Sequence, residues 1–288
     1  MKYIAVLITC HNRLEKTKAC LKSFYSCILP ESCAFEIFLV DDGSTDGTSE
    51  VIKNEFKEVS IIQGNGNLFW TGGMRLAWQA AIKRQTFDAF LLLNDDVILD
   101  YNFFSKFIET ELFSLKATNK MGIYVGSTID SFGNISYGGH RLKNYHFYIN
   151  IEKLLPSNIP QSCHLTNANI LWVSHNVVEE IGIFDQKFRH AIADYDYSLR
   201  AVKKGVPVYL TPGVCGYCTD DHGKNWETAK MPIMKRIEYL KSPKGLEYKE
   251  YMFYIRRHFP LYLPYSFIMI WLKTFFPQLW DRTKKNLQ

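Results

Sequence analysis

Three short apolar segments in the first 126 residues each stop at a cluster of polar residues. The predicted strands, which are apolar and β-prone, are Tyr3–Thr9, Phe35–Val40, Val59–Gln63 and Ala89–Leu93. The predicted helices between them are Leu14–Phe24, Thr48–Phe56 and Gly72–Gln85. This alternation predicts a parallel sheet covered by helices on both faces. Ligands of such sheets bind beyond the carboxyl ends of the strands, where the clusters TCHN, DDGSTD and NDD fall.

The second cluster opens with two adjacent carboxylates, Asp41 and Asp42. Like charges repel, so we expect hydrogen-bond donors or a cation around them. The segment DDGSTDGT imitates four positions of a calcium loop, but Lys53 stands where a bidentate glutamate is required and a strand precedes it, which excludes that site. Asp46 is predicted to cap the following helix.

The third cluster, Asn94, Asp95 and Asp96, lies between apolar runs where a buried strand reaches the surface. Adjacent strand residues point to opposite faces, so the two carboxylates should have different tasks. One is predicted to contact a ribose hydroxyl, and the other to bind a hard cation through oxygen.

The second half of the chain divides less clearly. A hairpin is predicted around Gly133–Asn134, a helix that closes at Gly205, and a strand at 206–212. We expect one domain at 1–226, with a donor-binding half at about 1–126 and an acceptor-side half at about 127–226. A basic, aromatic and helical region is expected at 227–288.

Charge and composition limit the partners. The net charge of +5 is too small to indicate nucleic acid, but the basic aromatic C-terminal region is compatible with an anionic membrane surface. A homodimer interface through the C-terminal helices, or a lid over the core, is the alternative. The apolar stretch that starts at Leu261 is interrupted by Pro264, Lys273 and Pro277, so we expect it to lie in an interface and not to cross.

The N-terminus and the cysteines indicate a cytoplasmic protein. MKYIAVLITCHNR is read as a first strand and not as a signal peptide. The seven cysteines are irregularly spaced, which indicates a reduced state, and the pair in CGYC lacks a second pair at zinc-site spacing.

The ordered motifs VLITCHNR, FLVDDGSTDGT, GNGNLFWTGGMRLA, LLLNDDV, VVEEIGIFDQKF and DYDYSLRAVKKG resemble the family 2 glycosyltransferases, particularly bacterial rhamnosyltransferase-like members. The resemblance covers roughly the first 225 residues. It implies the GT-A fold, an α/β architecture with a mixed, mostly parallel sheet flanked by helices, followed here by a C-terminal helical extension.

The resemblance also implies an activity: a metal-dependent inverting transferase of the hexosyltransferase type. The donor would be a nucleotide sugar, a UDP- or dTDP-sugar, and the cofactor Mg²⁺ or Mn²⁺. The acceptor would be a hydroxyl of a saccharide or lipid-linked saccharide in bacterial cell-surface polysaccharide or glycolipid assembly. The expected location is the cytoplasm, with peripheral attachment to the inner face of the cell membrane.

Carried over by position, the resemblance implies a set of site residues. Those expected around the donor are Thr9, Asn12, Asp41, Asp42, Asn67, Trp70, Arg75, Asn94 and Asp95. Asp96 and His222 would bind the metal, and Asp194 would be the catalytic base, with Asp196 as a second candidate.

The chain departs from the family pattern at three places. Asn94-Asp95-Asp96 allows the ribose contact to fall on Asn94, Ala193 replaces a common glutamate, and Arg75 replaces a common asparagine.

Two other functions fit parts of the sequence. A nucleotidyltransferase also uses metal carboxylates on an α/β sheet, but TCHNRLEK lacks the glycine-rich phosphate loop expected after the first strand. A non-catalytic, membrane-associated nucleotide-sugar-binding protein would keep the donor site, and a change at Asp194 would not alter its binding of the nucleotide sugar.

Overall fold

A mixed sheet forms the centre of the molecule, and four of its strands are parallel neighbours. The computed structural model describes residues 1–143, 149–219 and 231–278. The parallel half runs in the order β4-β1-β2-β3. These strands are β1 (Lys2–Cys10), β2 (Cys33–Asp41), β3 (Val59–Gln63) and β4 (Ala89–Leu93). The predicted strands are therefore confirmed to within two residues at each end.

The other half of the sheet joins β4 through an antiparallel strand. β12 (Ile170–Ser174) pairs antiparallel with both β4 and β6 (Ile123–Ile129), and β13 (Val208–Tyr217) runs parallel to β6. Short strands pair at its margins: β5 (Ile98–Leu99), β7 (Ile135–Tyr137) and β10 (Gln161–Ser162). The predicted mixed, mostly parallel sheet is confirmed, and so is the hairpin, which joins β6 to β7.

A separate three-stranded sheet stands beside the main one. It contains β8 (Gly139–Leu142), β9 (Ile151–Lys153) and β11 (Leu165–Thr166) in the order β11-β8-β9.

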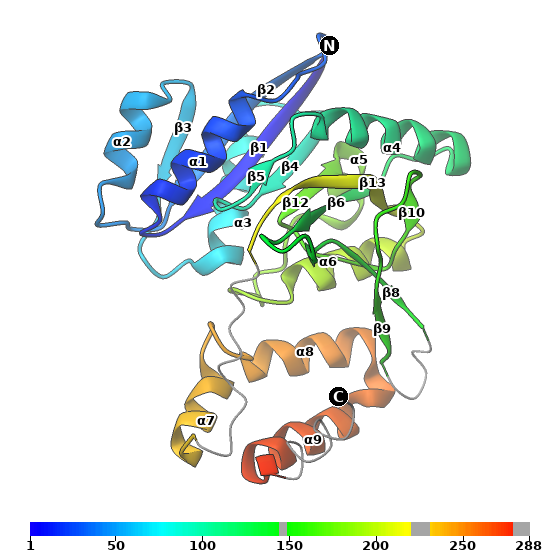
Figure 1. Ribbon diagram of the computed structural model, residues 1–288. Helices are drawn as coiled ribbons and strands as arrows, with labels where there is room; N and C mark the ends of the chain where they lie inside the picture. The colour runs from blue at the N-terminus through cyan, green and yellow to red at the C-terminus, as the bar shows by residue number, and fades with distance from the viewer. Residues whose placement is uncertain (144–148, 220–230, 279–288) are drawn as a thin grey trace.

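Helices cover both faces of the main sheet (Figure 1). One buried cluster joins alternate residues of β1, Ala5 and Leu7, to α3 (Phe69–Arg84), α5 (His175–Ile181) and α6 (Ala193–Lys203). The opposite cluster joins Ile4, Val6 and Ile8 to three further helices. Those helices are α1 (Leu14–Tyr25), α2 (Thr48–Glu55) and α4 (Phe103–Thr118). Strands that are apolar throughout are buried on both faces in this way.

The C-terminal helices form a further layer beneath α6. They are α7 (Ile233–Lys241), α8 (Tyr248–His258), the 3-10 turn η1 (Pro260–Tyr262) and α9 (Leu263–Phe275). Figure 1 shows α8 between α6 and α9, and α8 contacts both helices. None of the helices in the described ranges is long and apolar enough to span a membrane. The expected domain boundary at 226/227 lies outside the described residues.

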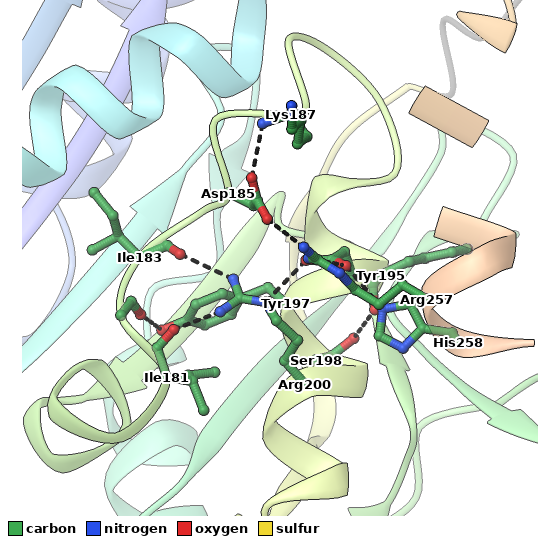
Figure 2. Close-up of polar contacts among 12 residues, drawn as sticks. Ile181, Ile183, Asp185, Lys187, Tyr195, Tyr197, Ser198, Arg200, Arg257 and His258 are labelled. Atoms are coloured by element: carbon green, nitrogen blue, oxygen red, sulfur yellow. Dashed lines mark hydrogen bonds and ion pairs between the residues drawn. The ribbon is translucent and has the colours of Figure 1, made fainter. Parts of the chain in front are cut away.

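A buried ionic cluster fastens α8 to α6 (Figure 2). The side chain of Asp196 is fully buried in the first turn of α6. Its carboxylate accepts hydrogen bonds from Arg257 Nη1 at 2.9 and 3.0 Å, from Arg200 Nε at 2.9 Å and from His258 Nε2 at 2.8 Å. Arg257 also pairs with Asp185, in the segment before α6. We call these five residues the α6–α8 clamp.

The clamp keeps Asp196 ionised. Burial disfavours its charged form, but the hydrogen bond from His258 and the charges of Arg200 and Arg257 outweigh burial, and the pKa of Asp196 is lowered. Burial also lowers the pKa of His258.

A second set of ion pairs holds the segment 182–192 against α8. Arg189 Nη2 donates to Glu247 at 2.7 Å, and its Nε and backbone N–H donate to Glu250 at 3.3 and 3.1 Å. The carbonyl of Arg189 accepts the backbone N–H groups of Thr71 at 3.0 Å and Gly72 at 3.4 Å in α3. The segment 182–192 is thus held between α3 and α8.

Replacing Arg257 with alanine should lower the free energy of unfolding by about 3 kcal/mol, because a buried carboxylate that loses a partner is strongly destabilised. Denaturant unfolding at neutral pH measures this loss. The control is Arg256→Ala at the exposed neighbouring arginine, which should change the free energy by less than about 0.5 kcal/mol. Equal losses in both variants would contradict the role given to the clamp.

The contribution of Asp196 should depend on pH. Since its folded-state pKa lies below the ordinary value of 3.8, its stabilisation is present above that value and is lost as the pH falls through the folded pKa. The difference in unfolding free energy between wild type and Arg257→Ala should stay constant from about pH 7 to pH 5 and become smaller below about pH 4. A difference that grew in acid would contradict this reading.

Candidate functional site

Asp41, the first acid of the pair at the end of β2, is nearly fully buried. Its carboxylate accepts the backbone N–H of Ser44 at 2.9 Å and the hydroxyl of Ser49 in α2. The expected hydrogen-bond donors around the acidic pair are therefore present, and at Asp41 they come from the turn that follows it.

Asp42 fastens the segment after β3 to the end of β2. Its Oδ1 accepts the backbone N–H of Gly66 at 2.8 Å, and Oδ2 accepts those of Leu68 and Phe69 at 2.9 and 3.1 Å. The last two N–H groups belong to the start of α3, where backbone donors lack helical partners and favour a negative charge. A Cβ at Gly64 would lie 2.6 Å from Asp42 Oδ1, so the close approach requires glycine.

Asp46 accepts hydrogen bonds from the first residues of two helices. Its carboxylate accepts the backbone N–H of Leu14 at 3.0 Å and that of Thr48 at 3.1 Å, the first residues of α1 and α2. The hydrogen bond from the Thr48 hydroxyl contributes most to lowering its pKa. The cap position itself is occupied by Gly47, one residue after the predicted cap.

Thr9 and Asn12 lie at the end of β1 and just after it, beside the acidic pair. Asn12 has a left-handed backbone with φ of 51°, and its Oδ1 accepts the backbone N–H of Thr45 at 2.7 Å. Thr9 packs directly under α3, because a Cβ at Gly73 would lie 2.0 Å from its Oγ1. The polar ends of β1 and β2 therefore meet, as the parallel sheet predicts.

Asp95 and Asp96 share one cationic side chain. Arg13 Nη1 donates to Asp95 at 3.0 Å and Nη2 donates to Asp96 at 2.8 Å. Asp95 is buried, and burial raises its pKa to about 7 although Arg13 opposes the shift. Asn94 and Asp96 are both partly exposed. Asp95 and Asp96 both lie in the turn after β4 and both contact Arg13, so the expected placement of the two carboxylates on opposite faces of a strand is wrong.

The carboxylate pair fits a divalent cation. Mg²⁺ is usually held by one or two carboxylates together with substrate phosphates, and carboxylate oxygens suit both Mg²⁺ and Mn²⁺. Arg13 bridges Asp95 and Asp96, so this pair already accommodates positive charge. No cluster of three or more metal-binding side chains occurs within residues 1–143, 149–219 and 231–278.

Trp70 connects the start of α3 to the third acidic cluster. Its Nε1 donates to Asn94 Oδ1 at 2.7 Å, and its backbone N–H donates to His190 Nδ1 at 3.4 Å. Since Trp70 directly follows the two residues bonded to Asp42, a continuous series of contacts joins Asp42 to Asn94.

A similar series joins Asp194 to Asp96. Asp194 lies half-buried in the first turn of α6, where its Oδ2 accepts the backbone N–H of Ala168 at 3.2 Å. The next residue, Asn169, donates to Cys218 Sγ at 3.5 Å, and that thiol donates to Asp96 Oδ1 at 3.5 Å. The carbonyl of Asn169 also accepts the backbone N–H of Asn94 at 2.9 Å.

The two candidate bases have different surroundings. Asp196 is fully buried and belongs to the clamp, while Asp194 is partly exposed. Asp194 Oδ1 accepts the backbone N–H of Tyr195 at 2.9 Å, which helps to orient the carboxylate.

The remaining expected site residues are Asn67, Arg75 and His222. Asn67 is exposed, and its backbone N–H donates to Asn65 Oδ1 at 3.0 Å. Arg75 Nη1 donates to the carbonyls of Asp185 at 3.2 Å and Phe188 at 3.0 Å, so this guanidinium supports the segment 182–192. His222 lies outside the described residues.

The sequence did not indicate four residues that contact the expected site residues: Arg13, Asn169, His190 and Cys218. Arg13 is the one with a local signal, since it directly follows the polar cluster after β1. The other three reach the site only through strand pairing and the packing of distant segments.

The chain is similar to known glycosyltransferases in sequence and in fold. The model of the family described as Glycosyl transferase family 2 matches residues 5–172, more than half of the chain. The fold is similar to the crystal structure of S. aureus TarS 1-349 in complex with UDP, with a TM-score of 0.54 and 13% identity over 76% of this chain and 60% of that chain. It is also similar to GalNAc-T7 with UDP, GalNAc and Mn²⁺, with a TM-score of 0.56 and 14% identity over 75% of this chain and 43% of that chain.

At 13% and 14% sequence identity, the similarity to these two structures shows the fold alone, which is of the GT-A type. This chain spans less than two thirds of the length of either solved protein. No curated protein sequence matches it. The matched segment carries β1 to β4 with all three polar clusters and reaches into β12, and on this ground the chain belongs to glycosyl transferase family 2.

Proposed function

We propose that the protein is an inverting, metal-dependent glycosyltransferase of the hexosyltransferase type, with Asp194 as its general base. The observation that carries the proposal is the contact series that brings Asp42, Asp96 and Asp194 to one region from distant parts of the chain. Such a transfer needs a nucleotide site, a cation site and a base on the far side of the sugar, and these three acids supply one group for each.

The nucleoside is placed against the ends of β1 and β2. Asp42 Oδ1 accepts one backbone hydrogen bond from the described residues, so a second lone pair is left for a donor on the base edge. Thr9 and Asn12 border this position, and Asp41 shapes the turn beside it. Asn94 is more exposed than Asp95, which favours Asn94 as the ribose contact. A UDP- or dTDP-sugar is the proposed donor, and both solved neighbours are described with UDP.

The donor diphosphate is placed at Asp96. Asp96 would hold the Mg²⁺ or Mn²⁺ ion, with Asp95 behind it and His222 as a further ligand. When bound, this ion stabilises the negative charge that develops on the leaving diphosphate. Arg13 orients both carboxylates, and its two N–H groups prevent their mutual repulsion from separating them.

Asp194 would activate the acceptor. Its two hydrogen bonds to backbone N–H groups fix the carboxylate, and Asp194 is partly exposed, as a base that meets an incoming hydroxyl must be. The acceptor proton moves to Asp194 while the hydroxyl oxygen bonds to the anomeric carbon and the bond to the diphosphate oxygen breaks. Attack on the face opposite the diphosphate inverts the configuration.

The acceptor side is formed by the second half of the domain. Asp194 contacts Ala168, which follows β11 of the small sheet, so the acceptor would approach over β8 and β11. A saccharide or lipid-linked saccharide of the bacterial cell surface is the proposed acceptor, and the rhamnosyltransferase-like subtype and an inner-membrane location belong to the same proposal. A non-catalytic nucleotide-sugar-binding protein is the alternative.

Replacing Asp194 with asparagine should lower the rate of transfer by about 10²–10⁴-fold, because the acceptor loses its proton acceptor. Donor affinity, measured by calorimetry with UDP and Mn²⁺, should stay unchanged. The matched control is Glu179→Gln on the neighbouring helix α5, an exposed carboxylate that should leave both quantities unchanged. Transfer that survives in Asp194→Asn would contradict the role given to this residue.

Replacing Asp96 with asparagine should weaken Mn²⁺ binding by at least about tenfold, because a neutral amide is a poorer ligand for a hard cation. Mn²⁺ binding can be followed by electron paramagnetic resonance of the free ion, both without nucleotide and with UDP. Chelation with EDTA should abolish transfer in the wild type and leave the far-UV circular dichroism unchanged. Full transfer in EDTA would refute the metal assignment.

A further inference from the structure

A groove of about 630 Å³ lies between α8 and α9, on the side of α8 that faces away from α6. Its lining is mostly apolar and aromatic. The lining residues are Tyr248, Lys249, Met252, Phe253, Arg256, Leu263, Pro264, Phe267 and Ile268. Lining residues on both helices recur at spacings of one and four, so each helix presents one continuous face to the groove.

Helix α8 has two faces with different roles. One face is directed toward the domain. On it, Glu250 pairs with Arg189 and Tyr254 packs in the main core. Arg257 and His258 on the same face belong to the clamp. The opposite face of α8 lines the groove. Because the clamp fixes α8 to α6, the groove is also fixed relative to Asp194.

Helix α9 extends the apolar surface beyond the groove. Phe267 and Ile268 are 49% and 54% exposed although they line it. Further exposed apolar residues on and beside α9 are Leu261, Tyr265, Leu272, Phe275 and Phe276. An exposed apolar surface of this extent marks an interaction site.

The charges around the groove select an anionic partner. Lys249 and Arg256 line the groove and are both exposed. The described residues 231–278 include eight lysines and arginines and three glutamates. Two of these acids, Glu247 and Glu250, are buried against Arg189, and Glu238 pairs with Lys235.

We propose that the groove binds a hydrocarbon chain of an anionic phospholipid, so that α8 and α9 lie in the surface of an anionic bilayer. The apolar floor would take the chain, and Lys249 and Arg256 would meet the phosphate headgroup. The thirteen residues of α9 extend about 20 Å, less than the ~30 Å thickness of the hydrocarbon layer, which suits a helix lying in the interface.

A second copy of the chain fits this surface less well. In a twofold dimer the same patch faces itself, so Lys249 and Arg256 of both copies would approach one another. The three glutamates within residues 231–278, which could offset this repulsion, are paired elsewhere, as described above.

The proposal has a consequence for the substrate, which rests on the proposed function. With α8 held against the bilayer and clamped to α6, Asp194 lies at a fixed position relative to the membrane surface. Such an arrangement suits an acceptor saccharide whose lipid is anchored in the same bilayer.

Flotation of the full-length protein with vesicles tests the proposal. Wild type should float with phosphatidylglycerol vesicles at low salt and remain unbound with phosphatidylcholine. Ile268→Asp should weaken the vesicle association at least about tenfold, since it places a charge where the chain would lie. Arg256→Gln should weaken it about fivefold, and high salt should have a similar effect.

The matched control is Leu112→Asp on α4, where an apolar side chain that is 63% exposed lies outside the groove. Its vesicle binding should equal that of wild type. The proposal is overturned if wild type stays off phosphatidylglycerol vesicles, if Ile268→Asp floats like wild type, or if both aspartate variants lose binding equally. It is also overturned if size-exclusion chromatography shows a wild-type dimer that Ile268→Asp dissociates, because the groove would then be an interface between copies.

Binding of UDP with Mn²⁺, measured on the same samples, separates this proposal from the proposed function. Retained nucleotide binding in Ile268→Asp confirms that the variant is folded. Wild type that floats but does not bind UDP would refute the donor site and leave the lipid groove standing.

Discussion

The carboxylate of Asp42 is the interaction on which the arrangement of the site depends. It accepts three backbone hydrogen bonds from the residues that lead into α3, and it thereby attaches that helix to the carboxyl end of β2. The position of α3 then places Trp70 against Asn94. Without these bonds, a buried charge and the unpaired N–H groups of a helix start would both lack partners, which is costly. One acidic side chain therefore solves a folding problem and borders the proposed nucleotide pocket.

The segment 182–192 extends this organisation to the C-terminal helices. Its Arg189 carbonyl receives two N–H groups of α3, while the Arg189 side chain pairs with Glu250 of α8 and with Glu247 at the N-cap of that helix. The clamp at Asp196 adds a second attachment between α8 and α6. The helix that carries Asp194 is thus held from the donor side by α3 and from the other side by α8.

Local sequence predicted the elements well, and long-range contacts account for what it missed. Apolar runs located β1 to β4 because such runs are long enough only for buried strands. Helix α3 begins at Phe69, three residues before the prediction, because its start is set by Asp42 from another strand. Likewise, the acidic clusters were visible as motifs, while the roles of Arg13 and Cys218 depend on partners 83 and 122 residues away in the chain. Asp41 was expected around the donor, and the motif did not reveal that the turn after it supplies hydrogen-bond donors to its carboxylate.

A crystal structure of the protein with UDP and Mn²⁺ tests the central claim most directly. The account predicts the uracil and ribose between the ends of β1 and β2, with the metal and diphosphate at Asp96 and with Asp194 across an open space large enough for a sugar. A nucleotide bound elsewhere, or a diphosphate out of reach of Asp96, would contradict it.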